Sequence, residues 1–73
     1  MATTPKLENR LRVARAERQL SQEELAALVG VTRQTISSIE TGQYCPSALL
    51  AFVLAKRLGK PVEDLFQLKE AKK

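Results

Sequence analysis

The sequence predicts an all-α fold in which five short helices pack into one small domain. Two observations support this prediction. Apolar residues recur at helical spacing in several segments, and residues that suit a helix N-cap stand just before most of them. Glycines at positions 30, 42 and 59 follow three of these segments, where helices commonly end. We find no strand-like alternation of useful length, so β structure is not expected.

The first helix is expected to begin at residue 6 or 7 and to run to about residue 19. Its apolar residues include Leu7, Leu11 and Ala14, which share one face, whereas most of its basic residues lie elsewhere. Leu20 is expected to pack at the junction with the next helix.

Residues 22–29 are expected to form the second helix. Ser21 is suited to cap its N-terminus, and Glu24 three residues later completes a capping box, in which each side chain accepts a hydrogen bond from the other residue's backbone N–H. Apolar residues then recur at helical spacing until Gly30, where a left-handed conformation ends the helix at little cost.

A third helix, residues 33–41, is expected after Thr32, which can cap it. Ile36 and Ile39 give this helix an inward apolar stripe. Its outward face carries arginine, glutamine and hydroxyl groups, with no carboxylate before Glu40. Because arginine and glutamine bind guanine and adenine edges through paired hydrogen bonds, the sequence predicts that this face binds DNA. The outward residues are Arg33, Gln34, Thr35, Ser37 and Ser38.

Two further helices complete the prediction. Ser47 is suited to cap the fourth, residues 48–58, and Gly59 ends it. Pro61 fits the first turn of the fifth, residues 61–66, which carries two acidic residues near its positive N-terminal end.

Length and charge limit the possible functions. We expect residues 1–73 to form a single domain whose ends, residues 1–5 and 69–73, are flexible. Lysine and arginine total 12 against 8 aspartates and glutamates, and the net charge of +4 is compatible with a polyanionic partner. We find neither a signal-peptide pattern nor a membrane-spanning run, so we expect a cytoplasmic protein with no membrane partner.

Catalysis and cofactor binding are not expected. The sequence has no histidine and a single cysteine, Cys45, which excludes an internal disulfide and zinc sites of the usual kind. It also lacks a glycine-rich phosphate loop and a convergent pair of carboxylates. We therefore expect no enzyme activity, no metal and no cofactor, and we interpret Cys45 as a surface thiol rather than a redox sensor.

The order and spacing of these segments resemble the phage-repressor and Cro-like helix-turn-helix family, also called the XRE type. The residues that carry the resemblance are LSQEELAALVGVTRQTISSIETG, then PS, then LGKPVEDLF, and it covers roughly residues 9–68. The resemblance implies a five-helix repressor-like domain in which helices two and three form the helix-turn-helix and the third lies in the DNA major groove. The implied function is that of a sequence-specific DNA-binding transcriptional regulator.

The resemblance also implies roles for particular residues. Gln22 matches a position that contacts a phosphate and braces the recognition helix, residues 33–41. Arg15 and Glu40 match a partly buried ion pair between helices one and three, and a charge beside the inward-facing Ile39 needs such a partner. We expect DNA contacts, to base edges from the helix and to the backbone from its flanks, at Thr32, Arg33, Gln34, Thr35, Ser37, Ser38, Thr41, Gln43 and Tyr44.

Some of these residues have a structural alternative. Ser37 and Ser38 could be ordinary surface polar residues, and Tyr44 could pack over its loop instead of contacting DNA. Three arginines of the first helix could contact phosphates or form only a solvated face, and we favour solvation for two of them. These arginines are Arg10, Arg12 and Arg18.

The fourth helix is apolar around much of its circumference, beyond the stripe of Leu50, Leu54 and Leu58. A helix of this kind must bury two faces, so we expect one to pack on the core and the other on a second copy of the chain. A homodimer would also place two recognition helices on a pseudo-palindromic operator. The expected interface residues are Leu49, Phe52, Val53, Phe66 and Leu68.

An alternative function is that of a protein-interaction module, such as an antitoxin that masks a toxin, in which DNA binding is secondary. The apolar surface of the fourth helix would then bind that partner. A restriction-modification controller, which is also a small dimer of this fold, is a variant of the regulator. RNA polymerase is a further candidate partner of the second helix, but Glu23 and Glu24 alone are not sufficient to predict that contact.

Overall fold

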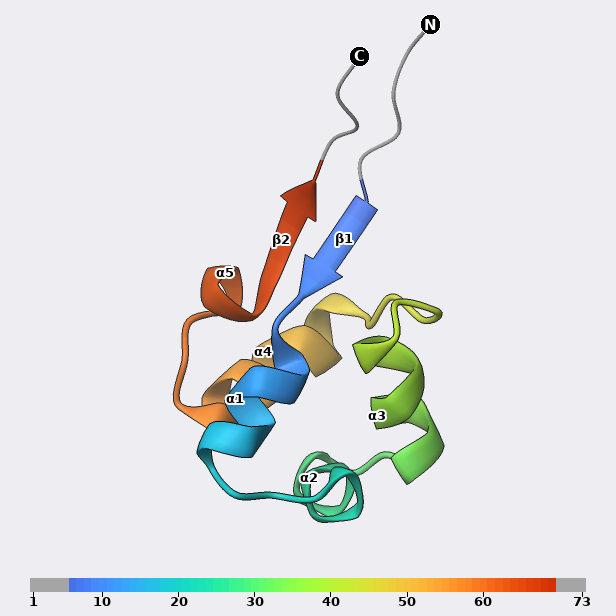
Figure 1. Ribbon diagram of the computed structural model, residues 1–73, viewed down its shortest axis with the longest axis vertical. Helices are drawn as coiled ribbons and strands as arrows, with labels where there is room; N and C mark the ends of the chain where they lie inside the picture. Colours follow the sequence, from blue (N-terminus) through green and yellow to red (C-terminus); the bar gives the residue numbers. More distant parts are fainter. Residues whose placement is uncertain (1–5, 70–73) are drawn as a thin grey trace, which may run out of the picture.

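The computed structural model describes residues 6–69, which form five helices and a two-stranded antiparallel sheet (Figure 1). The expectation of flexible ends at residues 1–5 and 70–73 lies outside the described residues, and Lys69 is part of the second strand. In chain order the elements are β1 (Lys6–Asn9), α1 (Leu11–Glu17), α2 (Gln22–Val29), α3 (Arg33–Glu40), α4 (Ala48–Leu58), α5 (Val62–Leu65) and β2 (Phe66–Lys69).

The prediction that no strands form was wrong at both ends of the described chain. β1 pairs with β2 so that Leu7 lies opposite Leu68 and Asn9 lies opposite Phe66, and this ribbon projects from one end of the helical body (Figure 1). The first helix therefore begins only at Leu11. Each strand has four residues, which is too short for a clear alternation, and the pairing joins segments that are far apart in the sequence.

The predicted helix caps are confirmed. The hydroxyl of Ser21 accepts a hydrogen bond from the N–H of Glu24 at 3.0 Å, and the carboxylate of Glu24 accepts one from the N–H of Ser21 at 2.8 Å. Thr32 and Ser47 cap α3 and α4 with their hydroxyl groups, and Gly30 ends α2 in the left-handed conformation at a φ of +78°. Local sequence thus determines where these helices begin.

Two helix ends differ from the prediction. α1 stops at Glu17, and Gln19 has a left-handed φ of +57° that cannot continue a helix. By contrast, α3 ends at Glu40 with Thr41 as its C-cap, within one residue of its predicted end. α5 is limited to Val62–Leu65, because the next residue begins β2.

One apolar core joins all five helices to the ribbon. Each helix supplies at least one fully or almost fully buried side chain, and Figure 1 shows α1 crossing α4 beside the corner made by α2 and α3. Within residues 6–69, none of the helices has the length and apolar character needed to span a bilayer. The buried residues are Leu11, Ala14, Leu25, Ala26, Ile36, Ile39, Leu54, Ala55, Leu58, Leu65 and Phe66.

Candidate nucleic-acid interface

The turn between α2 and α3 is built by three residues, each with a separate task. Gly30 reverses the chain direction, the N–H of Val31 donates to the carbonyl of Ala26 at 3.0 Å, and Thr32 caps the next helix. The buried faces of the two helices meet through small and branched side chains, among them Ala26 and Ile36. The opposite face of α3 is thereby directed away from the core.

This outward face begins with two side chains that the protein leaves free. Arg33 and Gln34 are exposed, and neither side chain hydrogen-bonds to another residue between positions 6 and 69. By contrast, the hydroxyl of Thr35 lies 3.0 Å from that of Thr32, so these two groups help to fix the first turn. A guanidinium and a carboxamide without internal partners are well suited to bind base edges.

The remaining predicted α3 contacts, Ser37 and Ser38, are half-buried, so they are less accessible than Arg33 and Gln34. Ser38 has a structural role through its carbonyl, which accepts the N–H groups of Gln43 at 2.9 Å and Tyr44 at 3.2 Å. The hydroxyl of Thr41 also donates to this carbonyl at 3.2 Å. One carbonyl thus organises the loop whose side chains are exposed next to the recognition helix.

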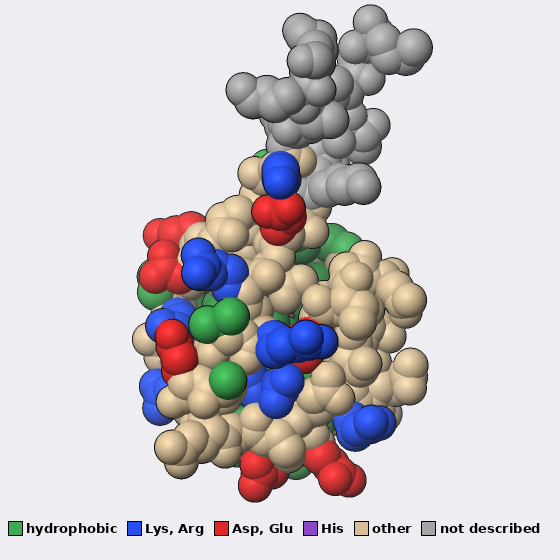
Figure 2. Space-filling model, viewed as in Figure 1, with side chains coloured by type: hydrophobic (Ala, Val, Ile, Leu, Met, Phe, Trp, Pro, Cys, Tyr) green, Lys and Arg blue, Asp and Glu red, His purple; other side chains and the backbone are tan. Residues whose placement is uncertain are grey.

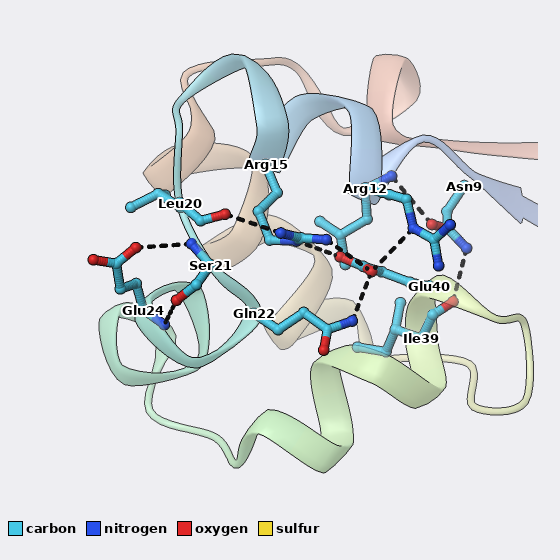
Figure 3. A network of polar contacts seen from close by, with 10 residues as sticks. Asn9, Arg12, Arg15, Leu20, Ser21, Gln22, Glu24, Ile39 and Glu40 are labelled. Atoms are coloured by element: carbon cyan, nitrogen blue, oxygen red, sulfur yellow. Dashed lines mark hydrogen bonds and ion pairs between the residues drawn. The ribbon is translucent and has the colours of Figure 1, made fainter.

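The C-terminal residue of α3, Glu40, is the centre of a polar network (Figure 3). Its side chain is 0% exposed, and its Oε2 accepts from Nε of Arg15 at 2.7 Å. Its Oε1 accepts from Nη2 of Arg15 at 3.3 Å and from Nε2 of Gln22 at 3.0 Å. Nε of Arg12 lies 3.6 Å from the same oxygen. α1, α2 and α3 therefore converge on one carboxylate.

The network keeps that carboxylate ionised. Burial by itself would raise the pKa of Glu40, but hydrogen bonds from Arg15 and Gln22 and the positive charges of Arg15 and Arg12 together hold this pKa below its ordinary value. Arg15 also donates from Nη1 to the carbonyl of Leu20 at 2.9 Å, so it ties down the α1–α2 connection as well. The expected Arg15–Glu40 contact is present in the structure and fixes the recognition helix against its neighbours.

Gln22 contacts the recognition helix from the start of α2. One N–H of its side-chain amide is used by Glu40, as expected of a residue that braces the recognition helix. The group carries a second N–H, for which no hydrogen bond is found within residues 6–69. The side chain is half-buried, so its position is set by the protein before any ligand arrives.

Arg18 has a structural role that the sequence pattern did not predict. Its Nε donates to the carbonyl of Leu58 at 3.2 Å, and its guanidinium lies over Gly59, where an added Cβ would collide with it. Arg18 therefore caps the end of α4 while its side chain remains exposed, and a phosphate contact from it stays a prediction. Arg12 is largely exposed beside Glu40, and Arg10 is exposed at the start of α1.

Charge alone does not mark the interface. In the view of Figure 2, lysine and arginine side chains gather near the centre and along one side, while acidic side chains lie in several separate places, over α2, beside α5 and on the ribbon. The outward face of α3 differs because it has no acidic residue before Glu40, whose charge is buried and neutralised. The candidate interface is therefore defined by side-chain chemistry on α3.

The expected dimer surface is only partly as predicted. Leu49 and Phe52 are 75% and 63% exposed, and Leu68 is 70% exposed on β2. Val53 is half-buried. The prediction for Phe66 was wrong, since this first residue of β2 is 8% exposed and packs in the core.

No metal or redox centre accompanies the site within the part of the chain that the structure describes. There, no three histidine, cysteine, aspartate or glutamate residues gather closely enough to hold a metal ion. Cys45 is exposed, and its thiol lies 3.8 Å from the carbonyl of Pro46.

Comparison with known proteins agrees with this architecture. The sequence model of the helix-turn-helix family matches residues 11–65. A protein described as an uncharacterized HTH-type transcriptional regulator of Methanocaldococcus jannaschii is 50% identical over 60 residues, which cover 82% of this chain and 91% of the relative. The HTH-type transcriptional regulator YgzD of Bacillus subtilis, also uncharacterized, is 45% identical over 64 residues, which cover 88% and 97% of the two chains.

A solved structure shares the same fold. The restriction-modification controller protein C.AhdI from Aeromonas hydrophila superposes with a TM-score of 0.71 at 36% sequence identity, over 75% of this chain and 80% of that one. The family is one of DNA-binding regulators and not of enzymes. The chain belongs to the helix-turn-helix family of phage-repressor and Cro-like (XRE-type) domains.

Proposed function

We propose that this protein is a sequence-specific transcriptional regulator that binds double-stranded DNA as a homodimer at a pseudo-palindromic operator. The observation that carries the proposal is the outward face of α3, where Arg33 and Gln34 are exposed and make no side-chain hydrogen bond to the described part of the chain, while the helix behind them is fixed. Family membership and the printed descriptions of the relatives support the same class of function. A cytoplasmic location is part of this proposal, because the proposed ligand is DNA.

In this proposal α3 lies in the major groove. Arg33 would donate paired hydrogen bonds to O6 and N7 of a guanine, and Gln34 would pair with N6 and N7 of an adenine. The hydroxyls of Thr35, Ser37 and Ser38 would contact neighbouring base edges or phosphates. Backbone contacts would come from the start of α2 and from the two ends of α3, through Gln22, Thr32, Thr41, Gln43 and Tyr44.

The buried network at Glu40 would hold α3 in a fixed orientation for DNA recognition. A side chain that reads a base must be held in place before binding, because ordering it on the DNA would reduce the affinity. Arg15 and Gln22 both hydrogen-bond to the last residue of α3, so rotation of the helix would break several short contacts at once. The ion pair thereby acts on DNA binding without touching DNA.

A homodimer would supply the second recognition helix. One helix contacts too few base pairs for useful specificity, whereas two helices separated by about 34 Å reach successive major grooves on one side of the duplex. Leu49 and Phe52 on α4, with the half-buried Val53 and the exposed Leu68, offer the apolar surface that a second copy would cover. Because a two-fold interface uses the same patch on both copies, one such surface is sufficient.

Selection of bound duplexes from a random DNA pool at near-physiological salt tests the proposal. We expect recovery of an inverted repeat whose half-sites lie about one helical turn apart. Recovery of single half-sites would contradict the dimer but keep the DNA reader. If no sequence is enriched above background and binding depends only on the salt concentration, the sequence-specific function is contradicted.

The alternative function, a protein-interaction module such as an antitoxin, is favoured by the same exposed side chains, Leu49 and Phe52. A restriction-modification controller is a variant of the regulator that the structural likeness to C.AhdI supports. Mass in solution separates the two classes. A stable dimer supports the regulator. A chain that stays monomeric both at high protein concentration and in the presence of DNA supports the protein-interaction module, whose partner is then absent from the sample.

A further inference from the structure

Asn9, the last residue of β1, hydrogen-bonds to two helices at once (Figure 3). Its Nδ2 donates to the carbonyl of Ile39 in the last turn of α3 at 2.8 Å, and its Oδ1 accepts from the N–H of Leu11 at the start of α1 at 3.1 Å. Only this orientation of the amide satisfies both contacts, because exchanging its oxygen and nitrogen would place like groups together. Asparagine is thus matched to the site in both donor and acceptor.

The carbonyl of Ile39 is one of the helix-terminal carbonyls that lack the regular hydrogen bond from a residue four positions later in the helix. It also accepts the N–H of Gly42 at 3.0 Å, and Gly42 has a left-handed φ of +83°. The amide of Asn9 uses the remaining acceptor capacity of this oxygen. One carbonyl therefore joins the end of α3, the loop that follows it and the β ribbon.

The backbone of Asn9 is itself held in place. Asn9 lies opposite the buried Phe66 in the ribbon, and the next residue, Arg10, donates its N–H to the carbonyl of Leu65 at 2.8 Å. The donor that meets α3 is therefore fixed by the pairing of the two ends of the described chain. Neighbouring residues of α3 are held from different elements: Ile39 from β1, and Glu40 from α1 and α2.

We infer that Asn9 is a positioning residue for DNA recognition, through which the β1–β2 ribbon sets the C-terminal end of α3 and the adjoining loop. The expected effect on DNA binding rests on the proposed function, whereas the contact between Asn9 and Ile39 rests on the structure alone. Asn9 acts through the carbonyl of Ile39, which also holds Gly42 at the start of the loop, while the N–H groups of Gln43 and Tyr44 are held by the neighbouring carbonyl of Ser38. The β1–β2 ribbon thus contributes to DNA recognition by positioning the end of α3.

Two substitutions separate this role from a contribution to the start of α1. Asn9→Ser retains an oxygen that can accept the N–H of Leu11 but is too short to reach the carbonyl of Ile39. Asn9→Asp has the same shape as asparagine and retains the acceptor for α1, but it places a carboxylate oxygen against that carbonyl. A role confined to α1 would leave both variants equivalent to the wild type, since serine and aspartate suit helix starts.

The first readout needs no DNA. Amide hydrogen exchange at Gly42 and Gln43 is expected to be at least about threefold faster in both variants, with exchange in α1 unchanged. The second readout uses the duplex that the wild type recovers from a random pool. The ratio of affinity for that duplex to affinity for a shuffled one should fall about tenfold in Asn9→Ser and further in Asn9→Asp. Taking the ratio cancels the loss of affinity that a new negative charge causes for every DNA sequence.

The outcomes are distinct. If exchange at Gly42 and Gln43 and the affinity ratio both match the wild type in folded variants, the inference is wrong while the proposed function stands. If exchange accelerates but the ratio is unchanged, Asn9 is a structural residue only, and the inference is also wrong. If the wild type recovers no preferred sequence, the proposed function fails, and the exchange data alone then decide whether the contact orders the loop. Asn9→Ser remains informative if Asn9→Asp does not fold.

Discussion

Arg15 and Glu40 join α1 to the end of α3 through two hydrogen bonds, of 2.7 Å and 3.3 Å, across 25 residues of sequence. The carboxylate is inaccessible to solvent and the arginine side chain is 16% exposed, so both groups depend on each other for neutralisation. This pair sets the orientation of the recognition helix and supports its outward face, which is proposed to bind DNA.

Replacing Arg15 by alanine should destabilise the fold strongly. The change leaves the buried carboxylate of Glu40 with only a neutral amide and a largely exposed arginine, and breaking a buried pair in this way costs about 3 kcal/mol. Urea denaturation measures the free energy of unfolding. As a matched control, Glu17→Ala removes the ion pair with Lys60 on the surface of the same helix, and it should cost less than about 1 kcal/mol. Equal losses in the two variants would contradict the account.

The stability should decline in acid because of Glu40. The pKa of this group is lower in the folded state than its ordinary value of 4.5, so its contribution is fully present above pH 4.5 and is lost as the pH falls through the folded-state pKa. The variant Glu40→Gln cannot titrate at this position. Urea unfolding from pH 7 to pH 3 should therefore show a gap between wild type and variant that narrows below pH 4.5. A gap that stays constant over this range would show that the carboxylate is not stabilised as described.

Gln34→Ala should weaken binding to the recovered duplex by about 1–3 kcal/mol and binding to shuffled DNA only slightly. The reason is that the exposed carboxamide is proposed to contact a base edge, which only the correct sequence provides in the right place. Fluorescence anisotropy on both duplexes measures the difference. Gln19→Gly serves as the control, because it removes another exposed glutamine at a position whose φ of +57° suits glycine. Equal losses on the two duplexes would rule out base reading by Gln34.

Phe52→Glu should separate the proposed dimer. A charge in the centre of an apolar interface would be buried without a partner, so light scattering should report the mass of one chain instead of two. Affinity for the complete inverted repeat should fall accordingly, while binding to a single half-site changes little. Ala16→Glu adds the same charge to an exposed site on α1 and should leave the dimer intact. A variant that remains dimeric would place the interface elsewhere.

Features that depend on a few neighbouring residues could be predicted from the sequence. The caps at Ser21, Thr32 and Ser47 each involve a hydroxyl and an N–H three residues later, so a local pattern contains the whole interaction. The outward chemistry of Arg33 and Gln34 follows in the same way from helical spacing.

Features that depend on distant segments were missed. The ribbon pairs residues 6–9 with residues 66–69, and the contact between Asn9 and Ile39 spans 30 positions. Phe66 was mistaken for surface because its burial depends on that ribbon. The available signal for Asn9 was its position just ahead of an apolar helical segment, where asparagine often satisfies a free N–H. The Arg15–Glu40 pair came from a family resemblance supported by a general argument about buried charge, not from spacing.

The most direct test of the central claim is the ratio of two dissociation constants at near-physiological salt, one for the duplex recovered by selection and one for a shuffled duplex of the same composition. A sequence-specific regulator should bind the recovered duplex at least about a thousandfold more tightly. A ratio near one, with the same dependence on salt for both duplexes, would mean that only phosphates are recognised, and the proposed function would be wrong.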